Sequence, residues 1–249
     1  MPVTAIKLLD WLYPPICEVC GCGLSGGRAL CDPCAAGLPR IVPPFCDVCG
    51  ETFQGQIDGA FECPNCNGIS FHFEFARAAM DRSDEVLEMI HRLKYGKEIH
   101  LARELGGLAC LAFSDRRLEI AREEKWPLVP VPLHWRRKRE RQFNQAEEIA
   151  RVVAQEMGME LARKLKRIRK TQTQTRLSRK QRMENLKGAF AVRERSLFQK
   201  MRQPTSPAEP PGVILVDDVF TTGSTVDACA KVLRKAGVGR IAVLTVMRG

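Results

Sequence analysis

Eight cysteines near the start of the chain fall into four pairs, each with two residues between its members. The pairs are Cys17 and Cys20, Cys31 and Cys34, Cys46 and Cys49, and Cys63 and Cys66. Glycine follows two of them, in CEVCG and CDVCG, and allows the chain to turn sharply after the second thiolate. Eight thiolates fill two tetrahedral sites and leave no coordination position for water or substrate. The spacing therefore predicts two structural zinc sites.

Two other uses of paired cysteines fit this sequence less well. A disulfide framework needs an oxidising compartment, and the start MPVTAIKLLDWLYPP lacks the basic n-region and long apolar stretch of a secretory signal. A redox C-x2-C motif occurs singly beside a βαβ unit. Cys22 lies outside the pairs and is predicted to be a bystander. Sequential and crossed pairing would bind the same metal, and the short gap between Cys20 and Cys31 favours the sequential form.

A second group of residues suited to chemistry follows an apolar run near the end of the chain. Residues 213–216, VILV, predict a buried parallel strand, and Asp217 and Asp218 come directly after it. The polar run TTGST at 221–225 then precedes an amphipathic helix that stops at 236–237. Amides of a helix N-terminus and neighbouring hydroxyls suit a phosphate monoester. The carboxylates would repel that phosphate, so we expect them to serve ribose hydroxyls or a magnesium ion.

Strands and helices alternate around this site. Strands are predicted at 73–80, 128–131, near 189–192, at 213–216 and at 240–247, with helices near 83–95, 98–113, 143–157 and after 225. The alternation predicts an α/β domain with a mainly parallel sheet flanked by helices. Four prolines in 196–212 predict a surface loop. We place a double zinc-ribbon module at 1–72 and the α/β domain at 73–249.

Charge separates the same two regions. The chain carries a formal charge of +10, yet residues 1–75 hold three Lys and Arg against eight acids. Residues 134–187 hold 17 Lys and Arg against six acids, a density that suits phosphate groups or the backbone of a nucleic acid. Trp135, Phe143 and Tyr95 lie beside cations and are candidates for base stacking. A solvated basic face is the alternative interpretation of such a run.

Length and composition exclude several classes of protein. With 249 residues, the chain is too long for one small module and allows one ordinary domain with a small appendage. No run approaches the roughly 18 to 20 apolar residues that cross a bilayer. We therefore expect a cytoplasmic protein that is neither secreted nor membrane-spanning.

The segment VILVDDVFTTGST resembles the phosphoribosyl-diphosphate (PRPP) binding motif of type I phosphoribosyltransferases. Phe220 is the one slight departure, since an aliphatic residue is usual at this position. The resemblance implies a type I phosphoribosyltransferase-like fold in which Asp217 and Asp218 bind the ribose hydroxyls. It assigns the 5′-phosphate to the loop residues Thr221, Thr222, Gly223, Ser224 and Thr225.

Further motifs extend the resemblance over nearly the whole chain. Together with the cysteine pairs and the PRPP motif, they resemble the ComF family of competence-related proteins. These motifs are RLKYGK (92–97), VPVPLHWRRKRERQFNQA (129–146) and QTRLSRKQRMENLKGAF (174–190). The family commonly has glycine where this chain has Gln142. The resemblance implies a role in DNA uptake, with single-stranded DNA, a competence helicase or other DNA-uptake proteins as partners.

Two functions fit these residues. One is PRPP-dependent glycosyl transfer with Mg²⁺, in which positioning and electrostatics perform the catalysis around Asp217 and Asp218, and the acceptor is unknown. The other is a binding module for single-stranded DNA that retains the ribose-phosphate site. Both need cations against phosphates or a diphosphate, and the candidates are His134, Arg136, Arg137, Arg139, Arg141, Arg176, Arg179, Lys180 and Arg182.

Overall fold

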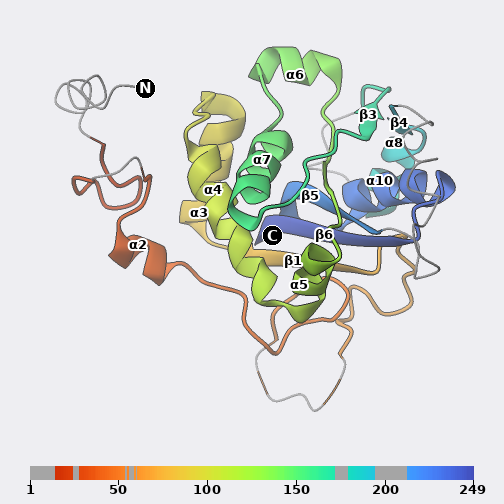
Figure 1. The fold of residues 1–249 in the computed structure, drawn as a ribbon, viewed down its shortest axis with the longest axis horizontal. Coiled ribbons are helices and arrows are strands. Elements are labelled where there is room, and N and C mark those ends of the chain that lie inside the picture. Colours follow the sequence, from red (N-terminus) through yellow and green to blue (C-terminus); the bar gives the residue numbers. More distant parts are fainter. Residues whose placement is uncertain are drawn as a thin grey trace.

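A four-stranded parallel sheet forms the centre of the molecule (Figure 1). The computed structural model describes residues 15–24, 28–53, 55, 59, 61–171, 179–193 and 212–249. The sheet has the order β1-β6-β5-β2, with neighbouring strands parallel throughout. Its strands are β1 (Phe75–Met80), β2 (Leu128–Pro130), β5 (Gly212–Phe220) and β6 (Arg240–Arg248). The mainly parallel sheet predicted from the alternating pattern is confirmed.

Alternate residues of β5 pack against helices on opposite faces of this sheet. Ile214 and Val216 join one apolar cluster with α4 (Leu101–Cys110) and α7 (Gln145–Met157). Val213 and Leu215 join another with α10 (Ser224–Lys235). Because both faces are covered, residues 213–216 of β5 are all apolar and show no alternation with polar residues.

The helices that precede α4 and follow it cover the first face. They are α3 (Asp84–His91), the π-helical turn η1 (Arg92–Gly96), the 3-10 turn η2 (Leu111–Ser114) and α5 (Arg116–Glu123). The helix expected over 83–95 thus ends in a π turn. Helices α4 and α7 approach closely at Gly106, where a Cβ atom would lie 2.5 Å from the side chain of Val152. This glycine is therefore required by packing.

Two elements differ from the sequence-based expectation. The strand near 189–192 is β4 (Phe190–Val192), and it pairs antiparallel with β3 (Leu165–Arg167) in a separate small sheet. Its three residues find their partner in β3, so the central sheet gains no fifth strand from it. The basic run after β2, for which the sequence analysis predicts no helix, forms α6 (Trp135–Arg141). Helix α8 (Arg179–Leu186) leads into β4.

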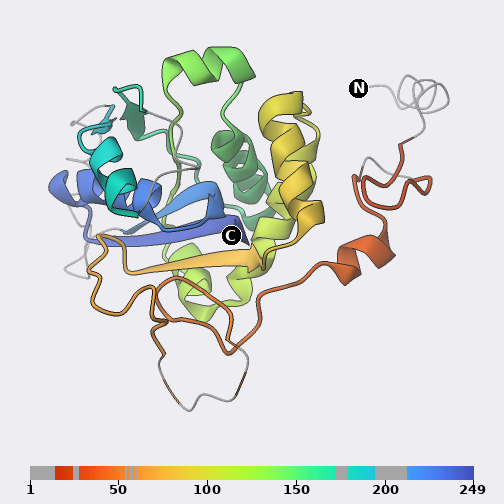
Figure 2. The ribbon, with the colours of Figure 1, turned by 180° about the vertical axis from the view of Figure 1, so that it is seen from behind.

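Residues before β1 wrap around its exposed edge. The backbone amide of Ile41 donates to the carbonyl of Ala79, and that of Ala76 donates to the carbonyl of Val48. Seen from behind, these loops run beneath β1, and the short helix α2 (Asp32–Gly37) lies to one side of the domain (Figure 2). The edge strand is thereby covered, which prevents it from pairing with another chain.

Two further expectations meet the limits of the described residues. The proline-rich segment 196–212 lies outside them except for Gly212, which begins β5. Among the described helices, none combines the length and the apolar character that crossing a bilayer requires. The domain boundary after residue 72 stays a prediction.

Candidate metal centres and phosphate site

The second pair of cysteine motifs forms a buried tetrad. The sulfurs of Cys46, Cys49, Cys63 and Cys66 all lie within 4.8 Å of one another. Each of these residues is at most 3% exposed, and the tetrad belongs to the apolar cluster under α10. The Sγ atoms of Cys49 and Cys63 are 3.5 Å apart, close to the roughly 3.8 Å edge of a tetrahedron with 2.3 Å zinc–sulfur bonds. The donor set and its geometry fit a closed structural zinc site.

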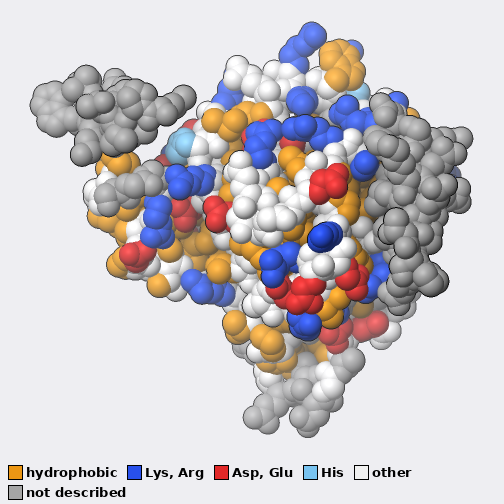
Figure 3. Space-filling model, viewed as in Figure 1, with side chains coloured by type: hydrophobic (Ala, Val, Ile, Leu, Met, Phe, Trp, Pro, Cys, Tyr) orange, Lys and Arg blue, Asp and Glu red, His pale blue; other side chains and the backbone are white. Residues whose placement is uncertain are grey.

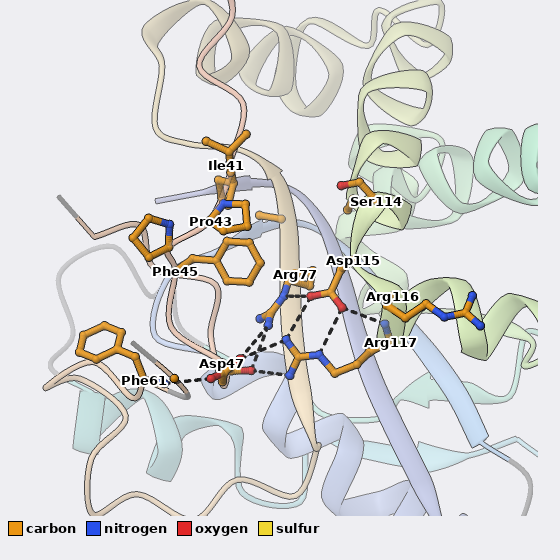
Figure 4. Close-up of a pocket in the computed structure, with 15 residues that line it drawn as sticks. Ile41, Pro43, Phe45, Asp47, Phe61, Arg77, Ser114, Asp115, Arg116 and Arg117 are labelled. Carbon is orange, nitrogen blue, oxygen red and sulfur yellow. Dashed lines mark hydrogen bonds and ion pairs between the residues drawn. The ribbon is translucent and has the colours of Figure 1, made fainter. Parts of the chain in front are cut away.

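A buried arginine joins this tetrad to the sheet. Arg77 of β1 is 2% exposed, and its Nη1 and Nη2 donate to the carbonyls of Cys46 and Asp47, each at 3.2 Å. Its Nε donates to Asp115, which also accepts from Arg117. These side chains line a cavity of about 640 Å³ between the cysteine loops and η2 (Figure 4). These hydrogen bonds fix the position of the turn at Cys46–Cys49, called the knuckle below, relative to β1.

The first cysteine group is more exposed and contains five thiols. The sulfurs of Cys17, Cys20, Cys22 and Cys31 lie within 4.8 Å of one another, and Cys20 and Cys22 are exposed. The Cys22 sulfur thus lies among those of the group, and its predicted bystander role stays a prediction. Cys34 lies within hydrogen-bonding reach of three of these thiols. The cysteine pairs combine in sequence order, the first two in one group and the last two in the other, as the short gap between Cys20 and Cys31 favours. All eleven cysteines lie in the described part of the chain and are free thiols.

Five thiols around a four-coordinate ion make one of them dispensable. We expect Cys22→Ser and Cys34→Ser each to leave two zinc ions per chain, because the remaining four sulfurs complete the tetrahedron. The double variant should lose one zinc. Elemental analysis of protein purified without chelator measures this directly. If Cys34→Ser alone removes a zinc while Cys22→Ser does not, Cys22 has no ligand role.

The acid pair lies inside β5, which is longer than the predicted strand. Asp218 is 5% exposed, and the Lys94 Nζ atom donates to its Oδ1 atom at 2.8 Å. Lys94 is presented by the π turn η1, 124 positions earlier in the chain. Desolvation, together with the neighbouring Asp218 charge, raises the pKa of Asp217 to about 7. One acid is thus held as an ion pair while the other is half protonated near neutral pH.

The loop after β5 makes a small hollow at the N-terminus of α10. Asp217 and residues 219–226 line a space of about 30 Å³. Gly223 has a positive φ of 74°, and a Cβ atom there would lie 2.7 Å from the ring of Phe220. The hydroxyls of Thr222 and Ser224 are 2.9 Å apart. First-turn amides of a helix and adjacent hydroxyls favour an anion, so the hollow suits a phosphate group.

The aromatic residue at position 220 has a packing reason. The Phe220 ring meets Phe73 edge to face, with centroids 6.1 Å apart, and Phe73 stacks on Phe71. The aromatic ring of Phe220 therefore packs the phosphate loop against the segment that follows the second cysteine tetrad.

A strongly positive region lies at the carboxyl end of β2. His134 is 6% exposed, and its Nδ1 atom accepts from the backbone amide of Arg136 at the start of α6. Desolvation and the charges of Arg167, Arg136, Lys170 and Arg137 lower the pKa of His134. The histidine is thus a neutral helix cap, and the surrounding cations make the field that an anionic ligand would meet.

Two exposed aromatic rings lie beside this region. Trp135 is 56% exposed, with the guanidinium groups of Arg136 and Arg139 at 5.2 and 5.5 Å from its ring centroid. Tyr95 is 70% exposed, and Arg141 lies 5.0 Å from its ring. Lys and Arg side chains gather over the upper end of the molecule, where α6 lies (Figure 3). Phe143, the third stacking candidate, is 9% exposed and packs in the core.

The structure brings together only part of the predicted basic set. Residues 136–141 belong to α6, which follows β2, and the phosphate loop follows β5. Because β2 and β5 are parallel, both segments start from the same end of the sheet. Arg176 lies outside the described residues. Helix α8 contains Arg179, Lys180 and Arg182. Sequence reasoning assigned no role to Lys94, Arg167 or Arg248. For Lys94 the RLKYGK motif was the available signal, whereas nothing local distinguishes Arg167 or Arg248.

Comparison with known proteins agrees with both halves of this description. A model of the double zinc ribbon domain matches residues 8–67. The chain is 34% identical over 157 residues to Competence protein F of Haemophilus influenzae, a match that covers 62% of this chain and 64% of that protein, less than two thirds of its length. It is 26% identical over 234 residues to the DNA utilization proteins YhgH of Salmonella typhimurium and Escherichia coli, covering 94% of this chain and 90% of theirs. Together with the double zinc ribbon and the parallel α/β sheet, these matches support a protein of the ComF family of competence-related proteins.

Proposed function

We propose that this protein acts in DNA uptake by binding single-stranded DNA, and that its strand–loop–helix site binds PRPP or a related ribose phosphate. The names of the relatives, Competence protein F and DNA utilization protein, support the first part. The second part is supported by one arrangement, the acid pair of β5 beside the hollow at the start of α10.

Each part of that arrangement suits one part of a ribose phosphate. The hollow suits the 5′-phosphate through helix amides and hydroxyls. Asp217 and Asp218 suit the ribose hydroxyls, which donate to carboxylates. Lys94 already neutralises Asp218 and would stay close to the sugar or to a phosphate beyond it. Mg²⁺ would enter with the diphosphate of PRPP and would neutralise part of its negative charge.

The aromatic rings of Trp135 and Tyr95 support the DNA role. Bases of any sequence stack on an exposed ring, and neighbouring arginines neutralise the phosphates between them. Arg141 contacts Tyr95, the residue next to Lys94, so the basic surface of α6 continues to the acid pair. A strand bound along α6 would therefore run toward the ribose-phosphate site.

Salt dependence of binding tests the DNA role. Replacing Arg136, Arg139 and Arg141 by Ala should make the slope of log affinity against log salt shallower by about 2, because each lost phosphate contact removes about 0.7. The set Arg176, Arg179, Lys180 and Arg182 should act in the same way. Trp135→Ala should weaken binding roughly 5- to 160-fold with little change in slope, since stacking is worth about 1–3 kcal/mol per base. Fluorescence anisotropy with labelled oligonucleotides at several salt concentrations measures both quantities.

A matched control removes arginines of the same kind elsewhere. Arg116→Ala with Arg122→Ala changes α5, which lies at the opposite end of the molecule from α6 (Figure 1). This variant should bind DNA as the unmodified protein does. If the α6 and α8 variants keep the original slope, the basic segment is a solvated face and the DNA role loses its support.

Catalysis is the second candidate function, and the positive region around His134 favours it. A departing diphosphate needs cations in a partly desolvated place, and four cations surround that residue. Release of diphosphate from PRPP and Mg²⁺ in the presence of candidate acceptors tests turnover. Binding of PRPP without release would identify the site as a binding site only.

A further inference from the structure

We infer that Arg248 is a positioning residue for the phosphate loop, and that the second cysteine tetrad, acting through Glu51, sets the affinity of that loop for phosphate. This inference rests on the proposed function. Arg248 is the last residue of β6 and is 6% exposed, so a charged side chain is held inside the protein next to the loop.

On the loop side, Arg248 fixes the first two peptide groups. Its Nη1 donates to the carbonyls of Phe220 and Thr221, both at 3.0 Å, and its guanidinium lies 5.3 Å from the ring of Phe220. In a trans peptide the carbonyl and the following N–H point in opposite directions. Holding these carbonyls toward Arg248 therefore turns the amides of Thr221 and Thr222 to the other side of the loop.

On the cysteine side, Arg248 pairs with Glu51, whose position is set by the turn at Cys46–Cys49. Its Nη2 forms an ion pair with the Glu51 carboxylate. The backbone carbonyl of Glu51 accepts from the amide of Cys46 at 2.8 Å, which closes the turn around Cys46 and Cys49. Gly50, at φ 69°, lets the chain make this turn against β1. Loss of the turn would therefore move Glu51.

Anchoring at the other side of the knuckle makes this connection stiff. Arg77 binds the carbonyls of Cys46 and Asp47 from β1, so the knuckle cannot shift along the sheet without breaking buried hydrogen bonds. Arg248 then joins the knuckle to the phosphate loop. A planar guanidinium reaches the two carbonyls with Nη1 and the carboxylate with Nη2, whereas a lysine would have to reach all three acceptors from one nitrogen.

The test compares three single variants and one double variant by titration with ribose 5-phosphate. Arg248→Met should lower the affinity at least about tenfold, because two oriented peptide groups lose a charged donor. Glu51→Gln should lower it less and should have no further effect when Arg248 is already Met. Arg240→Met removes another arginine of β6, paired with Glu124 at the opposite end of the strand, and should leave the affinity unchanged.

Zinc content and melting temperature separate positioning from a general loss of structure. Both zinc ions should remain in Arg248→Met, and its melting temperature should fall no further than that of Arg240→Met. If Arg248→Met does not fold, Glu51→Gln alone carries the test, since the Glu51 side chain is 38% exposed and the change conserves its shape. Affinity that is unchanged in the folded variants overturns the inference alone. Unmodified protein that binds no ribose 5-phosphate overturns the proposed function and the inference together.

Discussion

Replacing Asp217 and Asp218 together by Asn is expected to reduce the affinity for PRPP and ribose 5-phosphate at least about 100-fold. Each carboxylate that accepts from a ribose hydroxyl makes a charge-assisted bond worth about 1.5–3 kcal/mol, and two such losses multiply in the binding constant. The fold should persist, because Asn keeps the shape of Asp and can still accept from the backbone amide of residue 218. Isothermal titration calorimetry measures the affinity, and circular dichroism measures the fold.

The unusual pKa of Asp217 gives the same experiment a second readout. With a pKa of about 7, this acid is protonated below neutral pH and ionised above it. Affinity for ribose 5-phosphate should therefore rise as pH increases from about 6 to about 8, beyond the rise caused by the ligand's own phosphate, whose second pKa is about 6. In Asp217→Asn only the ligand's contribution should remain. Identical pH profiles, or unchanged affinity in the folded double variant, would contradict the assignment of the acids to the ribose.

Loss of the second metal site is expected to unfold the whole α/β domain. In Cys49→Ser or Cys63→Ser the tetrad loses one thiolate inside the apolar cluster shared with α10 and the sheet. A structural zinc ion contributes about 10–16 kcal/mol to folding at neutral pH in small zinc modules. A domain of this size has a total stability of about 5–15 kcal/mol, so even a part of that loss removes the folded state. Soluble yield, circular dichroism and zinc content measure the effect.

Two other cysteines serve as controls for that change. Cys20→Ser alters the exposed first group and should leave the sheet folded, because four other thiols remain there. Cys110→Ser changes a partly buried thiol of α4 outside both groups and should retain both zinc ions. A folded, soluble Cys49→Ser protein with a single zinc would mean that the apolar cluster is stable without its metal.

The contrast between the two cysteine groups was not available from their spacing. Four C-x2-C pairs are alike as sequence, yet one group is buried under α10 and the other has exposed thiols beside α2. Burial depends on which surface a loop contacts after folding. In the second group the loop contacts the sheet, where Arg77 of β1 binds the carbonyl of Cys46. Spacing also could not show that Cys22 lies among the sulfurs of the first group, since the route of the chain between pairs decides it.

The sequence by itself determined the elements and the chemistry that lies within them. Apolar runs predicted the strands, helical periodicity predicted α7 and α10, and the short motif at 213–225 placed acids and phosphate loop side by side, because all of these depend on neighbours within about one turn or one strand. Local pattern was misleading where it was weak. A run of charges hid the helix α6, and three apolar residues of β4 did not reveal which sheet they would join.

Only the tertiary structure decided which distant residues complete the site. Lys94 meets Asp218 across 124 positions, and Arg248 reaches Phe220 because β6 lies beside β5 in the sheet. Neither residue differs in type from the many other cations of a chain with 39 Lys and Arg. An ion pair of this kind depends on strand order and on the turn that presents each side chain, and both are fixed by packing of the whole sheet rather than by any local sequence pattern.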